Sequence, residues 1–174
     1  MTPSPLGQEA LAYADALYNH ARRLTRNDAD ADELVQETYL RALAGAHSFV
    51  AGNLKAWLFR IQQNTFIDLY RRGRHQPALS ELDVVDGAAD ALPLRDDFEL
   101  ERLRRLVAGD IEAALAALSD EARAIVLLDV EGFTEGEVAE VLGCALGTVK
   151  SRLSRARALL REKLKDYAPE GRGR

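Results

Sequence analysis

Apolar residues recur at three- and four-residue steps along most of the chain, and this spacing predicts amphipathic helices. Helices are expected over residues 7–25 and 30–44 and, after Asn53 as N-cap, over residues 54–72. Trp57 lies within the apolar stripe of the third helix and is assigned to its core. A loop over residues 45–52 separates the second helix from the third. Because no segment alternates with the period of a strand, the predicted fold class is all-α.

The helical periodicity fails between residues 76 and 101. This stretch contains two prolines and eight acidic residues against one arginine, which is typical of an acidic flexible linker with at most a short helix at its end. A second helical block follows, with helices expected over residues 98–118 and from the N-cap Ser119 to about residue 130. The predicted organisation is two small helical domains, 1–75 and 102–174, joined by the linker 76–101.

Residues 134–153 are typical of a helix-turn-helix. Thr134 and Glu137 have the spacing of a capping box, and Gly143 is placed to end the first helix in the left-handed conformation. The second helix has one apolar stripe, formed by Val149, Leu153, Ala156, Leu160 and Leu164.

The opposite face of this second helix carries hydroxyl and cationic side chains. A helix of this kind fits the major groove of duplex DNA, where short hydroxyls and Arg155 would reach base edges and flanking cations would meet phosphates. The alternative is a solvated cationic face without a ligand. The candidate DNA-binding residues are Thr148, Lys150, Ser151, Arg152, Ser154, Arg155 and Arg157.

Composition describes a globular chain with an uneven charge. Of 174 residues, 47% are hydrophobic and 29% charged, and the net charge is −5. Residues 144–174 nevertheless hold nine cations against three acids, and residues 53–75 hold five against one. Two basic patches on a negative chain bind DNA weakly alone, because the overall repulsion opposes them. This pattern indicates a subunit of a larger assembly.

Targeting and redox signals point to the cytoplasm. No apolar run approaches a membrane span, and the first residues lack the basic and apolar regions of a signal peptide. The single cysteine, Cys144, has no disulfide partner within the chain. It is interpreted as a small filler in the turn, with a redox-sensing role as the alternative.

Three segments, in this order around an acidic linker, resemble the extracytoplasmic-function (ECF) sigma factors, promoter-specificity subunits of bacterial RNA polymerase. Residues 30–42 are similar to the family's polymerase-binding helix, residues 56–72 to its promoter-melting helix, and residues 142–157 to its minus-thirty-five-reading segment. This sequence departs from the family's pattern at only a few positions of the helix-turn-helix. Glu135 and Gly136 replace an aromatic residue and an acid, and Ala145 replaces a proline.

The resemblance implies partners and roles for the first two segments. Core RNA polymerase would bind through the clamp of its largest subunit and the flap of its second largest, with Asp32, Glu33, Gln36 and Glu37 docking on the clamp. Phe49 and Asn64 would line a pocket for a flipped minus-ten base, since an extruded base needs an apolar wall and an amide; a loop anchor and an ordinary helix polar residue are the alternatives. Further minus-ten and melting contacts would come from Asn53, Lys55, Arg60, Arg71 and Arg72, with Arg74 on a nearby phosphate.

For the rest of the chain, the resemblance implies that residues 148–157 read the minus-thirty-five element of promoter DNA. It also implies that the linker threads the polymerase cleft as a displaceable RNA mimic; a solubilising tether is the alternative. An anti-sigma factor, often membrane-bound in this family, is an expected partner, although this chain itself would not enter the membrane.

An enzyme is the competing class, and the sequence argues against it. The three histidines are scattered, and no metal, nucleotide or cofactor motif is present. Asp28, Asp30 and Asp32 imitate a calcium loop, but Glu33 stands where glycine is needed and Tyr39 where the last glutamate belongs. No catalytic residue, cofactor or metal is therefore expected. The nearer alternative is a free-standing helix-turn-helix regulator that binds a palindrome as a dimer without polymerase.

Overall fold

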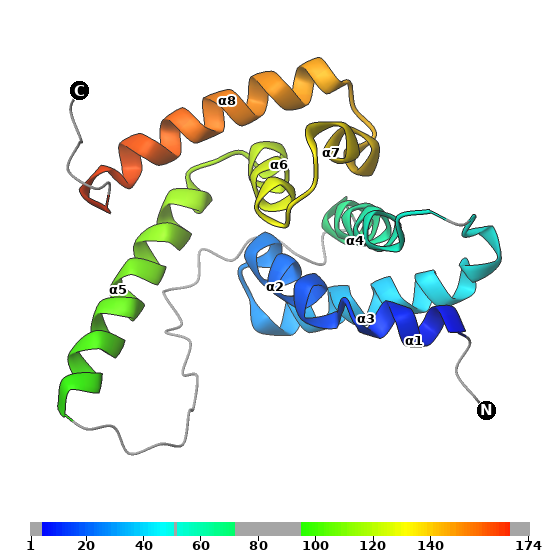
Figure 1. The fold of residues 1–174 in the computed structure, drawn as a ribbon, viewed down its shortest axis with the longest axis horizontal. Helices are drawn as coiled ribbons and strands as arrows, with labels where there is room; N and C mark the ends of the chain where they lie inside the picture. The colour runs from blue at the N-terminus through cyan, green and yellow to red at the C-terminus, as the bar shows by residue number, and fades with distance from the viewer. Residues whose placement is uncertain (1–4, 51, 72–94, 168–174) are drawn as a thin grey trace.

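The computed structural model describes residues 5–50, 52–71 and 95–167 (Figure 1). Within these residues the chain is helical and contains no strand, as the hydrophobic periodicity predicts. Its elements are α1 (Pro5–Leu11), α2 (Ala14–Thr25), α3 (Asp28–Ala44), the 3-10 helix η1 (Ala46–Ser48), α4 (Leu54–Arg71), α5 (Arg95–Ala116), α6 (Asp120–Val130), α7 (Glu135–Leu142), α8 (Leu146–Lys163) and the 3-10 helix η2 (Lys165–Tyr167). None of the helices in these ranges is both long and apolar enough to cross a bilayer.

The first helix expected from the sequence is two helices, because the chain breaks between Leu11 and Ala14. The Tyr39 hydroxyl of α3 donates to the Ala10 carbonyl at 3.0 Å, and the Tyr13 amide donates to the same oxygen at 3.1 Å. These bonds occupy the carbonyl that would continue a straight helix into α2. The second expected helix starts two residues earlier than predicted, at Asp28, since the Asn27 side chain caps it.

The N-terminal half, α1 to α4, is built around side chains from α2, α3 and α4. Leu17, Leu34, Leu58 and Phe59 are fully buried. The assignment of Trp57 to the core is only partly right. Its ring is half-buried, stacks obliquely on Phe49 with centroids 5.1 Å apart, and lines an apolar pocket.

In the C-terminal half, α5 to α8, the predicted cap residues are found at the ends of α6 and α7. The Ser119 hydroxyl accepts from the Ala122 amide, Thr134 and Glu137 form the capping box, and Gly143 ends α7 with φ of 63°. Val149, Leu153 and Ala156 of α8 are buried against α6 and α7, whereas Leu160 and Leu164 are half-buried. The predicted apolar stripe is therefore confirmed over its first two turns and only partly covered beyond them.

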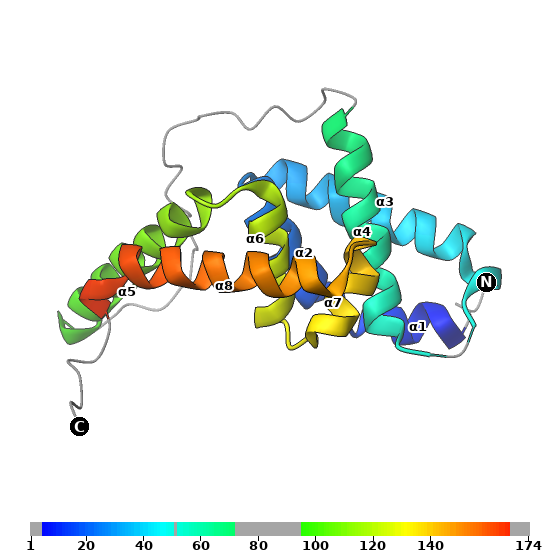
Figure 2. The same ribbon diagram turned by 90° about the horizontal axis from the view of Figure 1, so that it is seen from above.

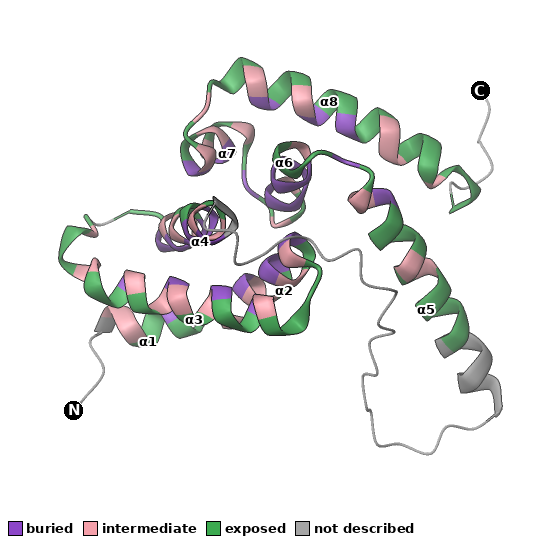
Figure 3. Ribbon diagram, turned by 180° about the vertical axis from the view of Figure 1, so that it is seen from behind, coloured by how far each residue is buried: buried purple, intermediate pink, exposed green. Residues whose placement is uncertain are grey.

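Helix α5 extends away from the rest of the C-terminal half and is largely exposed over its described side chains (Figure 3). The Tyr167 hydroxyl of η2 donates to the Asp110 carboxylate and ties η2 to α5. Helix α5 begins at Arg95, inside the segment expected as linker. The remainder of that linker, up to residue 94, together with Arg72 and Arg74, lies outside the described residues.

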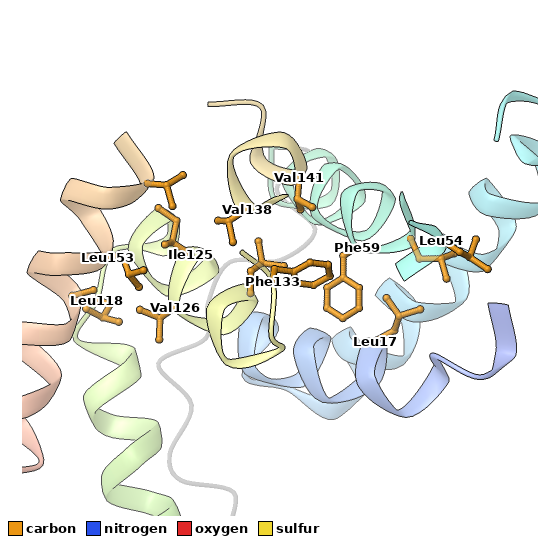
Figure 4. Packing of buried hydrophobic residues seen from close by; sticks show 14 of the residues in the cluster. Leu17, Leu54, Phe59, Leu118, Ile125, Val126, Phe133, Val138, Val141 and Leu153 are labelled. Atoms are coloured by element: carbon orange, nitrogen blue, oxygen red, sulfur yellow. The ribbon is translucent and has the colours of Figure 1, made fainter. Parts of the chain in front are cut away.

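The two halves pack against each other. Helices α6 and α7 lie between α8 and the N-terminal helices, with α7 against α4 and α6 against α2 (Figures 1 and 2). One cluster of buried side chains runs through both halves, and Phe59 of α4 meets Phe133 of the α6–α7 turn at its centre (Figure 4). The ring centroids are 5.1 Å apart. The hydrophobic core thus crosses the division between the two expected domains.

Candidate nucleic-acid interface

Helix α8 presents a polar face to solvent on the side opposite its buried stripe. Lys150, Ser151, Ser154, Arg155 and Arg157 are exposed, while Thr148 and Arg152 are half-buried. This face points away from the N-terminal half, because α6 and α7 lie on the other side of the helix (Figure 1). The structure brings all seven predicted residues onto one helix, and five of them are open to a ligand.

Several of these side chains are held by neighbours. Arg157 Nη2 donates to both carboxylate oxygens of Asp129, at 2.9 and 2.8 Å, which ties α8 to α6. Arg155 Nε donates to the Ser151 carbonyl at 3.2 Å, and Lys150 lies 3.9 Å from the Glu135 carboxylate. These exposed contacts are weak, so they leave the side chains available to a ligand.

The second basic helix, α4, carries Arg60 and Asn64 on its exposed surface. Phe49 stands beside α4 because it stacks on Trp57, two helical turns before Asn64. A shared pocket of Phe49 and Asn64 for a flipped base stays a prediction. Arg71 ends α4, and its side chain lies outside the described part of the chain.

Asn53 and Lys55, at the start of α4, contact the other half of the chain. The side-chain nitrogen of Asn53 donates to the Glu137 carboxylate at 2.9 Å, and the side-chain oxygen of Asn53 accepts from the backbone amide of Ala56 at 3.0 Å. Lys55 Nζ donates to the Glu131 carbonyl at 2.6 Å and lies 3.6 Å from the Glu131 carboxylate. The N-cap role of Asn53 is confirmed; the contacts to Glu131 and Glu137 could not be foreseen from local sequence.

Helix α3 presents the predicted polymerase-binding residues. Asp32, Glu33 and Gln36 are exposed, whereas Glu37 is half-buried and accepts from Arg41 at 2.8 Å. Arg41 also donates to Asp68 of α4 at 2.8 Å, and these two bonds raise the pKa of its guanidinium.

Two exposed leucines continue this face of α3. Leu40 is 63% exposed and Leu43 57%, and they follow Gln36 at helical spacing. Sequence reasoning missed them because periodicity assigns a leucine to the core. Exposed apolar side chains beside acidic ones are typical of a protein-binding surface.

Cys144 is half-buried in the turn between α7 and α8, which agrees with a packing role. His20 is buried, and its Nδ1 lies 2.8 Å from the Gln62 side-chain oxygen. In the ranges that the structure describes, no group of three potential metal ligands is found.

A helix-turn-helix with a cationic outer helix, joined to a second all-helical half with its own basic helix, defines a DNA-binding transcription protein. The family models for Sigma-70 region 2 and Sigma-70 region 4 match residues 10–76 and 108–160. This chain belongs to the ECF RNA polymerase sigma factors, the proteins that direct RNA polymerase to promoters.

Individual relatives support this family membership. The chain is 37% identical over 162 residues to the ECF sigma factor SigE of Mycolicibacterium smegmatis, covering 91% of this chain and 61% of that relative's length. It is 38% identical to EcfG of Rhodopseudomonas palustris over 95% of this chain and 91% of the relative. Among solved structures, the sigma factor RpoE of Bartonella quintana, in complex with the anti-sigma factor NepR, matches with a TM-score of 0.69 and 37% identity. That match covers 91% of this chain and 95% of RpoE.

Proposed function

We propose that the chain divides promoter recognition between its two basic helices. Helix α8 would read the minus-thirty-five element, because its exposed Ser151, Ser154 and Arg155 lie on the face of a helix-turn-helix that enters the major groove. Helix α4 would contact the minus-ten element and assist melting through Phe49, Arg60 and Asn64. The observation that carries this proposal is the exposed polar face of α8 opposite the buried side chains of Val149, Leu153 and Ala156.

The α3 face is proposed to dock on the clamp of core RNA polymerase. Its exposed carboxylates, Asp32 and Glu33, would supply charge complementarity, and Leu40 and Leu43 would supply apolar contact area. The C-terminal half would meet the flap of the second-largest subunit. These tasks involve binding and no catalytic step, and they would place the chain in the cytoplasm with the polymerase.

An anti-sigma factor is a further proposed partner. RpoE of Bartonella quintana, which this chain resembles, was solved in complex with the anti-sigma factor NepR. An apolar pocket in this chain, lined by Leu6, Ala10, Leu11, Tyr39, Leu43 and Trp57, offers a surface for such a protein. Competition between a purified anti-sigma factor and core polymerase for this chain would test the assignment.

Transcription from a genomic library by purified core polymerase, with and without this chain, tests the proposed function. Specific transcripts should appear only when the chain is added, since the core enzyme lacks promoter specificity. A chain that binds a palindromic duplex as a dimer and does not join the core enzyme would instead be a free-standing regulator.

Replacement of Asn64 by alanine tests the role of α4. The variant should bind core polymerase as wild type does, because Asn64 is exposed and lies on a different helix from the α3 face. Opening of a duplex promoter, followed by permanganate reactivity of unpaired thymines, should fall about tenfold or more if one edge contact to the flipped base is lost. Gln8→Ala, at an exposed position on α1, is the matched control. Unchanged opening would make Asn64 an ordinary surface residue.

A further inference from the structure

Helix α2 ends on an arginine in a backbone conformation that suits glycine. Arg26, its C-cap, has φ of 60°, and it is the one residue other than glycine with a positive φ in the described ranges. At the end of α7 the chain has Gly143, with φ of 63°, in the same position. A side chain in this left-handed region is strained, and such strain is concentrated at functional sites. The ending of the helix alone does not explain why an arginine stands here.

Arg26 lines a small hollow between α2, α5 and α6. Arg22 and Arg23 of α2 and Arg123 of α6 line it as well, and Glu112 of α5 supplies the one carboxylate among its described lining residues. Four guanidinium groups therefore share a hollow with a single acid. Like charges gathered in this way repel one another, and a bound anion would relieve that repulsion.

Two of the four guanidinium groups are fixed by neighbours. Arg123 is only 7% exposed, and it donates to the Leu115 carbonyl at 3.0 Å and to the Asp120 carboxylate at 3.1 Å. Arg22 Nε donates to the carboxylate of Asp28. These contacts hold two cations in place at the wall of the hollow.

The other two guanidinium groups can turn toward a ligand. Arg23 and Arg26 are exposed, and neither forms an ion pair within residues 5–50, 52–71 and 95–167. The planar fork of a guanidinium group matches the oxygens of a phosphate in a bidentate manner. Sites for small molecules are concave, and this hollow lies between three helices, so its position favours a small ligand over the backbone of a nucleic acid.

We propose that this hollow binds the phosphate group of a small phosphorylated molecule, with Arg23 and Arg26 as its direct ligands and Arg22 and Arg123 as a fixed positive wall. The ligand would contact both halves of the chain, since α2 belongs to one half and α5 and α6 to the other. The inference does not depend on the promoter-reading roles of α4 and α8, because no residue proposed for those roles lines the hollow.

Replacement of Arg26 by glycine separates the two properties of this position. Glycine adopts a positive φ without strain, so Arg26→Gly should be no less stable than wild type when phosphate is absent. The variant should nevertheless bind pyrophosphate about tenfold or more weakly, because a charge-assisted hydrogen bond is lost. Arg23→Gln removes the other direct ligand and should weaken binding to a similar degree. Arg161→Gln, which removes the same charge at an exposed position on α8, is the matched control.

The first measurement is isothermal titration calorimetry of the full chain with sodium pyrophosphate at constant ionic strength. Wild type and Arg161→Gln should bind one pyrophosphate per chain with the same Kd. At a hundredfold excess over that Kd, their midpoint of thermal unfolding should rise by about 5–10 °C, and that of Arg26→Gly by about half as much. Equal Kd values for wild type and all three variants would indicate an adventitious ion only and would overturn the proposal.

The lining carboxylate provides a test of opposite sign. Glu112→Gln removes the one acid of the hollow, so pyrophosphate should bind about twofold more tightly. Weaker binding would contradict a phosphate beside Glu112.

Titration with a duplex DNA that contains no promoter distinguishes the two sources of phosphate. Arg26→Gly and Arg23→Gln should leave its Kd within about twofold of wild type, because exposed cations far from a DNA-binding helix contribute little. If both variants instead weaken DNA binding and leave pyrophosphate binding unchanged, the hollow holds a nucleic-acid backbone, and the proposal of a small phosphorylated ligand is wrong.

Discussion

At the scale of single residues, Glu137 makes one contact within its own helix start and another with a distant part of the chain. Its carboxylate accepts from Thr134, three positions earlier, and from Asn53, which is 84 positions away. The first contact follows from the capping-box spacing, which is visible in the sequence. The second depends on α7 packing against α4. A residue expected to do no more than start a helix therefore also connects the two halves.

Two cations on α8 should have separable effects on DNA binding. Arg155→Ala should change selectivity at the minus-thirty-five element by about 1–3 kcal/mol, because an arginine that pairs with a base edge discriminates between bases. Lys150→Ala should weaken binding to all sequences and reduce the salt slope by about one unit. Fluorescence anisotropy of the polymerase complex on a panel of promoter variants, at several salt concentrations, measures both. Equal losses on every variant from both changes would contradict this division.

At the scale of elements, the helix ends follow local chemistry. Ser119 and Thr134 cap α6 and α7, and Gly143 ends α7 with a positive φ that other residues rarely adopt. The break between α1 and α2 follows a different cause, since it coincides with a hydrogen bond from Tyr39, 29 residues away from Ala10. Caps can be predicted from neighbouring residues, whereas such a break cannot.

Gly136 offers a test at this scale. It lies in the first turn of α7, and a Cβ added there would come no closer than 4.0 Å, to the Thr134 hydroxyl. Gly136→Ala should raise the free energy of unfolding by about 0.5–1 kcal/mol, because alanine loses less backbone entropy in a helix. Urea denaturation followed by circular dichroism measures the change. Gly143→Ala, at φ of 63°, is the opposite case and should destabilise the chain.

At the scale of the whole molecule, one buried cluster spans both halves, and a polar group lies within it. Burial lowers the pKa of His20 from 6.5 to about 4, the hydrogen bond with Gln62 opposes that change, and Arg23 adds to it. His20 also contacts Phe59, which reaches Phe133 in the other half. Protonation of His20 would thus place a charge close to the shared core.

Stability should therefore depend on pH through His20. Because its folded pKa lies below its unfolded pKa, the unfolded state takes up the proton first, and stability falls as pH drops below about 6.5 and levels off below about 4. From pH 8 to pH 5 this group should cost about 2 kcal/mol. Urea unfolding of wild type and His20→Gln across this range isolates the effect. The difference in free energy between the two should shrink as pH falls, and parallel pH profiles would contradict the assignment.

Much of the fold and of the α8 surface could be predicted before the structure, and the α3 face that is proposed to bind polymerase only in part. The stripe from Val149 to Ala156 and the exposed face of α8 followed from helical periodicity. Leu40 and Leu43 did not, because periodicity records which residues are apolar and not whether another helix covers them. Trp57 was placed in the core for the same reason, although the structure leaves its ring half-buried at an apolar pocket.

Most of the helices, their caps, the helix-turn-helix and the two basic segments follow from local sequence, since each depends on residues within a few positions of one another. The break between α1 and α2, the core shared by the two halves, and the contacts of Asn53 and Lys55 with Glu137 and Glu131 follow only from the packing of distant segments. The physical reason is that burial of apolar surface is non-directional. Many pairs of apolar faces could meet, and the choice among them depends on shape and charge complementarity across segments far apart in the chain.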